Sequence, residues 1–109
     1  MNEIRQYANY HGHSDVTPFE VLEVKSDRKV LIRGMKSERD PSWTPKIIAG
    51  GFVGHCTNQR GQKWNIESDD HGPAFAISKR KNGCWFRVGE THGRFIFADV
   101  PRKFYDYNF

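Results

Sequence analysis

The run from residue 50 to residue 64 holds the densest set of side chains that can recognise a ligand. Four glycines surround six hydrogen-bonding side chains, and almost nothing in the run is apolar. Because glycine reaches positive φ and lets other groups approach the backbone, the composition predicts a shaped binding loop rather than a strand or helix interior. Its backbone N–H groups and side-chain donors suit phosphates, so the expected ligand is anionic and nucleotide-like. The expected ligand-binding residues are Gly50, Gly51, Gly54, His55, Thr57, Asn58, Gln59, Arg60 and Trp64.

An alternative interpretation makes the same run an ordinary connection. Its polar side chains, His55, Asn58 and Arg60 among them, would then satisfy backbone groups, and removing them would destabilise the fold. Two further sets of residues could bind a ligand or a metal ion. Lys79, Arg80 and Lys81 precede Asn82-Gly83 and form a basic contact for phosphate, or an ordinary soluble hairpin tip.

His11, His13 and Asp15 would share one face of an extended chain, which is half of a metal site. Gly12 bends such a strand, however, and a solvated lead-in is the favoured interpretation, so no metal is assigned. Hydrolysis needs a nucleophile, a base and an orienting partner within hydrogen-bond reach. His55 and Cys56 are adjacent, and adjacent side chains of a strand point to opposite faces. We therefore assign no catalytic residue and no cofactor, and expect a protein that is not an enzyme.

Composition limits the setting and the partners. The chain has 109 residues and a net charge of +4, with 17 Lys/Arg against 13 Asp/Glu. This excess favours anionic partners, but the interspersed acidic residues make nucleic acid only one possibility. No apolar run is long enough to span a membrane, and no signal segment begins the chain, so we expect cytoplasmic residence. Cys56 and Cys84 fit two reduced thiols better than a disulfide.

The elements that must position these residues are short strands. Residues 19–25 and 29–36 are β-branched runs joined by a polar turn, which predicts a hairpin, with a bulge at Leu22 where the alternation breaks. Further strands are expected at 46–49, 62–67, 74–78, 84–88 and 94–98, with a type I′ turn at Asn82-Gly83 and a final strand in the aromatic tail. Pro41 and Pro45 exclude helix between 37 and 44, where Trp43 is expected in the core.

About eight short strands without a long helix predict an all-β protein. Its small size favours an SH3-like or related partly open β-barrel. We expect one domain over residues 1–109, with 1–15 as a polar lead-in and 16–109 as the barrel core.

Three groups of residues also carry a resemblance. They are Asp15-Val16-x-Pro18-Phe19-x-Val21, Gly50-Gly51-Phe52-x-Gly54-His55-x-x-Asn58-Gln59 with Gln62-Lys63-Trp64, and Lys103-Phe104-Tyr105-Asp106-Tyr107-Asn108-Phe109. Together they resemble a family of small, mostly uncharacterised proteins of tailed bacteriophages and prophages. The resemblance implies a setting, a phage accessory protein in the bacterial host cytoplasm with a possible counter-defence role, and no catalytic residues.

Three kinds of binding protein therefore compete. The first binds a nucleotide-like anion through the glycine-rich run, with Trp43, Trp64 or a tail tyrosine stacking on a base. The second inhibits a host protein, defence factors included, by docking the aromatic tail or the basic hairpin tip. The third is a nucleic-acid-binding barrel that uses Lys79, Arg80, Lys81, Arg87, Arg94, Arg102 and Lys103 with aromatics between them.

Overall fold

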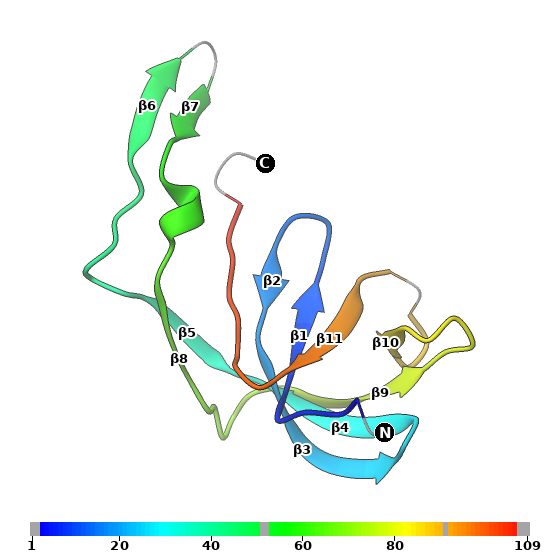
Figure 1. Ribbon diagram of the computed structural model, residues 1–109. Helices are drawn as coiled ribbons and strands as arrows, with labels where there is room; N and C mark the ends of the chain where they lie inside the picture. Colours follow the sequence, from blue (N-terminus) through cyan, green and yellow to red (C-terminus); the bar gives the residue numbers. More distant parts are fainter. Residues whose placement is uncertain (1–2, 51–52, 91, 107–109) are drawn as a thin grey trace.

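The computed structural model describes residues 3–50, 53–90 and 92–106. These residues form eleven strands and one short 3₁₀-helix, η1 (Figure 1). The strands are β1 (Tyr7–His11), β2 (Val16–Thr17), β3 (Phe19–Ser26), β4 (Lys29–Gly34), β5 (Lys36–Arg39), β6 (Ile47–Gly50), β7 (Val53–Cys56), β8 (Trp64–Glu67), β9 (Ala74–Lys79), β10 (Trp85–Arg87) and β11 (Arg94–Ala98), and η1 spans Gln59–Gly61.

Six strands close into an antiparallel barrel. β3 pairs with β4, β4 with β9, β9 with β10 and β10 with β11, and β11 returns to β1, which also meets β3. The prediction of a small all-β barrel is confirmed. The strands outnumber the predicted eight because the described chain also contains the two-residue β2 and four strands outside the barrel.

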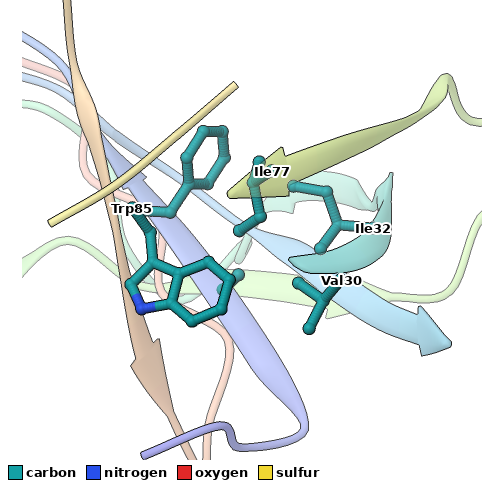
Figure 2. Close-up of a cluster of buried hydrophobic side chains, with 6 residues drawn as sticks. Val30, Ile32, Ile77 and Trp85 are labelled. Carbon is teal, nitrogen blue, oxygen red and sulfur yellow. The ribbon is translucent and has the colours of Figure 1, made fainter. Parts of the chain in front are cut away.

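The barrel interior is filled by one apolar cluster, part of which is shown in Figure 2. Its buried members are Ala8, Val30, Ile32, Ile77, Trp85 and Phe95. Val30 and Ile32 are two residues apart on β4, so both point inward. Tyr10, Phe19 and Phe75 surround Phe95 with ring centroids 5.0–6.0 Å away. Such aromatic pairs bury large areas and supply much of a small core.

The boundary predicted at residue 16 is wrong, because β1 is part of the barrel. Ala8 and Asn9 are buried within this strand. The Asn9 side-chain amide donates to the Val100 carbonyl at 3.2 Å and accepts from the Arg102 N–H at 2.9 Å. A polar sequence can therefore form a barrel strand because both the nitrogen and the oxygen of its buried amide bond backbone groups.

Two local predictions, the bulge in the β3–β4 hairpin and the type I′ turn between β9 and β10, have different outcomes. The β3–β4 register shifts between Val21 and Glu23, which confirms the bulge at Leu22. The type I′ turn is wrong, because only Gly83 has a positive φ, at 83°, whereas Asn82 does not. The Gly83 N–H instead donates to the Arg80 carbonyl at 2.9 Å. This is a type I turn followed by a left-handed glycine, the usual three-residue hairpin connection.

Residues 36–67 leave the barrel as an arm, and this name is kept below. β5 and β8 pair as a ribbon from Lys36↔Glu67 to Arg39↔Trp64, and β6 and β7 form a second hairpin that projects farthest from the barrel (Figure 1). Trp64 and Ile66 share the less exposed face of β8. Trp43 and Cys56 are buried at 8% and 2% exposure, so the core location predicted for Trp43 is correct.

The chain from residue 99 to residue 106, here the C-terminal segment, is fastened without forming a strand. Phe104 exchanges two backbone hydrogen bonds with Val16, and the Asp15 carboxylate accepts from the Asp106 N–H at 2.7 Å. The Gln62 side chain accepts from the Tyr105 N–H at 2.9 Å and donates to the Tyr105 carbonyl. The segment thus joins the barrel to the arm. The predicted final strand is replaced by a single bridge, and Tyr107, Asn108 and Phe109 lie outside the described residues.

No helix among the described residues is long and apolar enough to cross a membrane.

Candidate functional site

The polar residues of the glycine-rich run do not form the single loop predicted from sequence. Gly50 and Gly54 lie in β6 and β7, so the expectation of a loop without strand is wrong there. The two strands pair through their backbones from Ile47↔Cys56 to Gly50↔Val53. His55 is placed on β7 opposite Ile48, and Gly51 lies outside the described residues.

Asn58 is engaged by the fold of the arm. Its Oδ1 accepts from the Lys46 N–H at 2.8 Å, and its Nδ2 donates to the Thr44 carbonyl at 2.8 Å. The Cys56 thiol also approaches Oδ1, at 3.4 Å. The Asn58 side chain therefore joins the segment just before β6 to the segment just after β7. This is the arrangement expected from the alternative interpretation of the run.

The other predicted ligand-binding residues are divided between two places. Thr57 lies beside Lys46, to which its N–H donates at 3.0 Å, and Gln59 and Arg60 form η1. Trp64 lies on β8, where its indole N–H donates to the Gln62 side chain at 2.8 Å. Trp64 therefore faces the C-terminal segment, separate from the β6–β7 hairpin.

The basic hairpin tip is largely occupied by structural contacts. Lys79 forms an ion pair with Glu3 at 3.1 Å, and the Arg80 guanidinium donates to the Glu90 carbonyl at 2.7 Å. Glu3 also accepts from the Trp85 indole at 2.7 Å, and this hydrogen bond, followed by that from Lys79, lowers the pKa of the Glu3 carboxyl. Of the three predicted contacts, Lys81 is the exposed one.

His11, His13 and Asp15, which the sequence offered as an alternative half of a metal site, do not share one face of a strand. His11 ends β1, and the Gly12 N–H donates to the Asp15 carbonyl, so the chain turns between the two histidines and the aspartate. Within residues 3–50, 53–90 and 92–106, no group of three His, Cys, Asp or Glu side chains could hold a metal ion. Cys56 and Cys84 both remain thiols.

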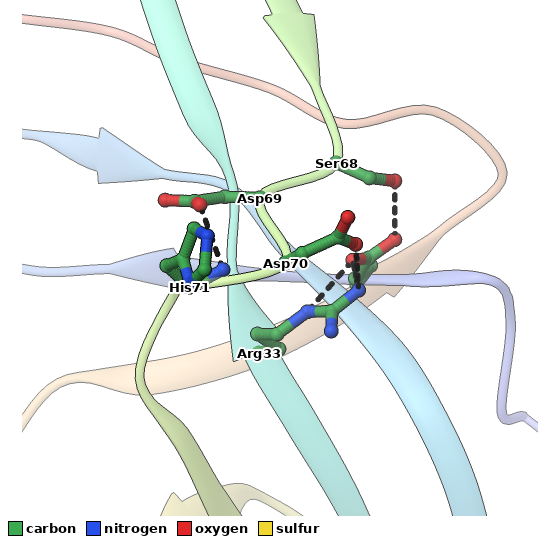
Figure 3. Close-up of polar contacts among 6 residues, drawn as sticks. Arg33, Ser68, Asp69, Asp70 and His71 are labelled. Atoms are coloured by element: carbon green, nitrogen blue, oxygen red, sulfur yellow. Dashed lines mark hydrogen bonds and ion pairs between the residues drawn. The ribbon is translucent and has the colours of Figure 1, made fainter.

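A second polar cluster lies where the β8–β9 turn meets β3 and β4 (Figure 3). Arg33 donates to the Glu20 carboxylate at 2.7 and 3.1 Å, and Ser68 donates to the other Glu20 oxygen at 2.8 Å. Burial of Glu20 acts to raise its pKa, but the hydrogen bonds from Arg33 and Ser68 and the Arg33 charge lower it overall. Within the turn, the His71 N–H donates to the Asp69 carboxylate at 3.0 Å. These contacts fasten the turn to the barrel.

Two neighbouring surface clefts gather the remaining cations. The Arg94 cleft has a volume of about 750 Å³ and lies between the end of β1, the β9–β10 turn and the start of β11. The Arg102 cleft has a volume of about 510 Å³ and lies between β1, β2, β8 and the C-terminal segment. His11 lines both clefts, so they adjoin at this residue.

The charged side chains that line the two clefts are positive. Arg94 lines the first cleft, Arg102 and Lys103 line the second, and no Asp or Glu is among the described residues that line either. None of these three cations forms an ion pair with a carboxylate in the described part of the chain. The pKa of His11 is lowered, mainly by burial of the imidazole and then by the nearby positive charges of Arg94 and Arg102. By contrast, two other hollows of the surface contain Glu3 and Asp99 respectively.

Each cleft also contains an aromatic ring with a cation beside it. Phe86 lines the Arg94 cleft, and the Arg80 guanidinium lies 5.3 Å from its ring centroid. Trp64 lines the Arg102 cleft, with the Lys103 ammonium 5.6 Å from its ring centroid. Sequence reasoning named most of these basic residues only as part of a general nucleic-acid surface. It missed His11 and Phe86 as cleft residues, because segments about 50 to 90 positions apart in sequence meet here and no local spacing signals it.

The fold and these clefts define a small β-barrel protein with an arm and a cationic, aromatic surface. Comparison with protein-family models, curated proteins and solved structures finds no match.

Proposed function

We propose that this chain is a non-enzymatic binding protein for an anionic, nucleotide-like ligand, held in the Arg94 and Arg102 clefts. One observation carries the proposal: two adjoining clefts contain Arg94, Arg102 and Lys103, and no carboxylate is among their described lining residues. A cleft walled by one sign of charge concentrates the field and attracts ligands of opposite charge. Volumes of this size are typical of small-molecule sites.

The clefts replace the glycine-rich run as the proposed site. Phosphate recognition needs donors that are not already committed, whereas the Asn58 amide bonds two backbone groups of the arm. Trp64 is the one residue shared by the earlier prediction and the clefts. The resemblance to phage proteins adds a proposed setting, a bacterial cell under infection, in which such a protein would sequester a nucleotide signal.

The experiment measures how ADP, dTMP and inorganic phosphate change the melting temperature of the protein. A ligand that binds only the folded state stabilises it by an amount that grows with the logarithm of ligand concentration. Removing a hydrogen bond to a charged group costs roughly 1.5–3 kcal/mol, so Arg94→Ala and Arg102→Ala should each weaken affinity about tenfold or more. Arg28→Ala removes the same charge from the β3–β4 turn and should leave affinity nearly unchanged. Failure of all three compounds to shift the melting temperature overturns the proposal, as does an equal loss of affinity in Arg28→Ala.

A second candidate function, docking onto a protein partner, is favoured by the arm. The β6–β7 hairpin projects from the molecule (Figure 1), and Ile47 on it is 56% exposed. A projecting hairpin with an exposed apolar residue suits insertion into a groove of another protein. Ile47→Lys should then abolish capture of that partner from a host extract and leave nucleotide binding intact.

A further inference from the structure

The arrangement of rings and charges in the two clefts specifies more than a single nucleotide. Phe86 and Trp64 lie in different clefts, and His11, which lines both, lies between them. One base can stack on one ring only. Tyr10 and Phe104 also line the clefts, but Phe86 and Trp64 are the rings with a cation beside them. These two rings, one in each cleft, therefore match a ligand with at least two bases connected by phosphates.

The groups that would bind phosphate are also divided between the two clefts. Arg94 lies in the cleft of Phe86, and Arg102 and Lys103 lie in the cleft of Trp64. Proteins that bind single strands without sequence preference combine a positive groove along the backbone with aromatic rings on which successive bases stack. In a duplex the base faces are already stacked on their neighbours, so they are not available to such rings.

We propose that the Arg94 and Arg102 clefts together form a binding groove for single-stranded nucleic acid, with one base at Phe86, another at Trp64, and the connecting phosphates near Arg94, Arg102 and Lys103. This inference rests on the proposed function, because it names the ligand class of the same site. DNA and RNA share the chemistry that the groove recognises, and the experiment separates them.

The probes are fluorescein-labelled dT12 and U12, a labelled DNA hairpin duplex, and unlabelled dTMP as competitor, with binding measured by fluorescence anisotropy. Stacking of a second base should make dT12 or U12 bind on the order of tenfold to a hundredfold tighter than dTMP. Three phosphate contacts predict that log affinity falls with log salt at a slope of about −2, from about −0.7 per contact on a single strand. Tight binding of either oligonucleotide supports the groove, and the tighter of the two names the nucleic acid.

The variants test which residues carry the binding. Arg94→Ala and Arg102→Ala should each reduce the salt slope by about 0.7, whereas Arg28→Ala should leave it unchanged. Phe86→Leu keeps an apolar side chain but removes the stacking face, and should weaken dT12 binding more than dTMP binding. Should Phe86→Leu fail to fold, Arg94→Ala still tests the groove, since the exposed Arg94 side chain forms no ion pair among the described residues.

The outcomes separate this inference from the proposed function. If dTMP binds as tightly as both dT12 and U12, the groove is wrong and the nucleotide site stands. If the duplex binds as tightly as the single strand, or Arg28→Ala lowers the slope as much as Arg102→Ala, the attraction is general to the charged surface and the groove is wrong. If no oligonucleotide binds, the groove is wrong, and if ADP, dTMP and inorganic phosphate also fail to bind, both proposals fall.

Discussion

Asn58 shows how a single amide can organise an arm that has little apolar interior. Its two ends bond the backbone on either side of Pro45, which cannot donate a hydrogen bond of its own. We expect Asn58→Ala to destabilise the protein by about 1–3 kcal/mol, because two partners lose their hydrogen bonds at once. Chemical denaturation with a constant m-value measures the change.

Arg60→Ala is the matched control for Asn58→Ala, since Arg60 is exposed on η1, two residues away. Its replacement should change stability by no more than about 0.5 kcal/mol. Equal stability of the two variants would show that Asn58 does not fasten the arm, and would return it to the list of ligand-binding candidates.

Glu20 makes the protein sensitive to acid. Its pKa in the folded state lies below the ordinary value of 4.5 for a glutamate carboxyl. The unfolded chain therefore binds more protons as the pH falls, and the stability that Glu20 contributes is complete above about pH 4.5 and is lost as the pH drops through its folded pKa. Glu20→Gln should flatten the fall of unfolding free energy below that pH. Glu38→Gln, an exposed carboxylate on β5, should keep the wild-type slope, and an identical slope in both variants would contradict the prediction.

At the scale of elements, a segment could be predicted from sequence when its contacts are with residues nearby in the chain, and not when they are with distant ones. The β3–β4 hairpin and its bulge were predicted because the apolar alternation and the turn are local. β1 was missed because it contains Asn9, whose burial depends on backbone groups of Val100 and Arg102, 91 and 93 residues away. The candidate site was predicted only in part. Trp64 and Arg102 were named in two separate hypotheses, and only the fold brings them together with His11 and Phe86.

The C-terminal segment is the element that connects the barrel to the arm. Deleting residues 104–109 removes the two bonds of Phe104 to Val16 and leaves Asp15 and Gln62 without their backbone partners. At about 1 kcal/mol per hydrogen bond, the loss of these five bonds is on the order of 5 kcal/mol, which lowers the melting temperature by more than about 10 °C. Gln62→Ala in the full chain should give a smaller shift in the same direction. An unchanged melting temperature after the deletion would show that the segment does not stabilise the fold.

For the whole molecule, the barrel and the arm have separate interiors. Every residue of the barrel's apolar cluster comes from outside residues 36–67, whereas Trp43 and Cys56 are buried within the arm. The molecule measures 49 × 28 × 26 Å, and the elongation follows from the arm projecting past the barrel (Figure 1). The arm nevertheless contributes Trp64 and Gln62 to the Arg102 cleft, so the proposed binding groove spans both parts.

This division predicts that the barrel folds without the arm. Lys36 and Glu67 are paired across the β5–β8 ribbon, which places their Cα atoms about 5 Å apart, so an Asn-Gly turn can replace residues 37–66. The shortened protein should keep a single cooperative thermal transition, at a lower temperature because the Gln62–Tyr105 contacts are gone. It should also bind dT12 no more tightly than dTMP, since Trp64 is absent while Phe86 and Arg94 remain. Circular dichroism melts and anisotropy measure the two results, and the loss of a cooperative transition would show that the arm is required for the barrel to fold.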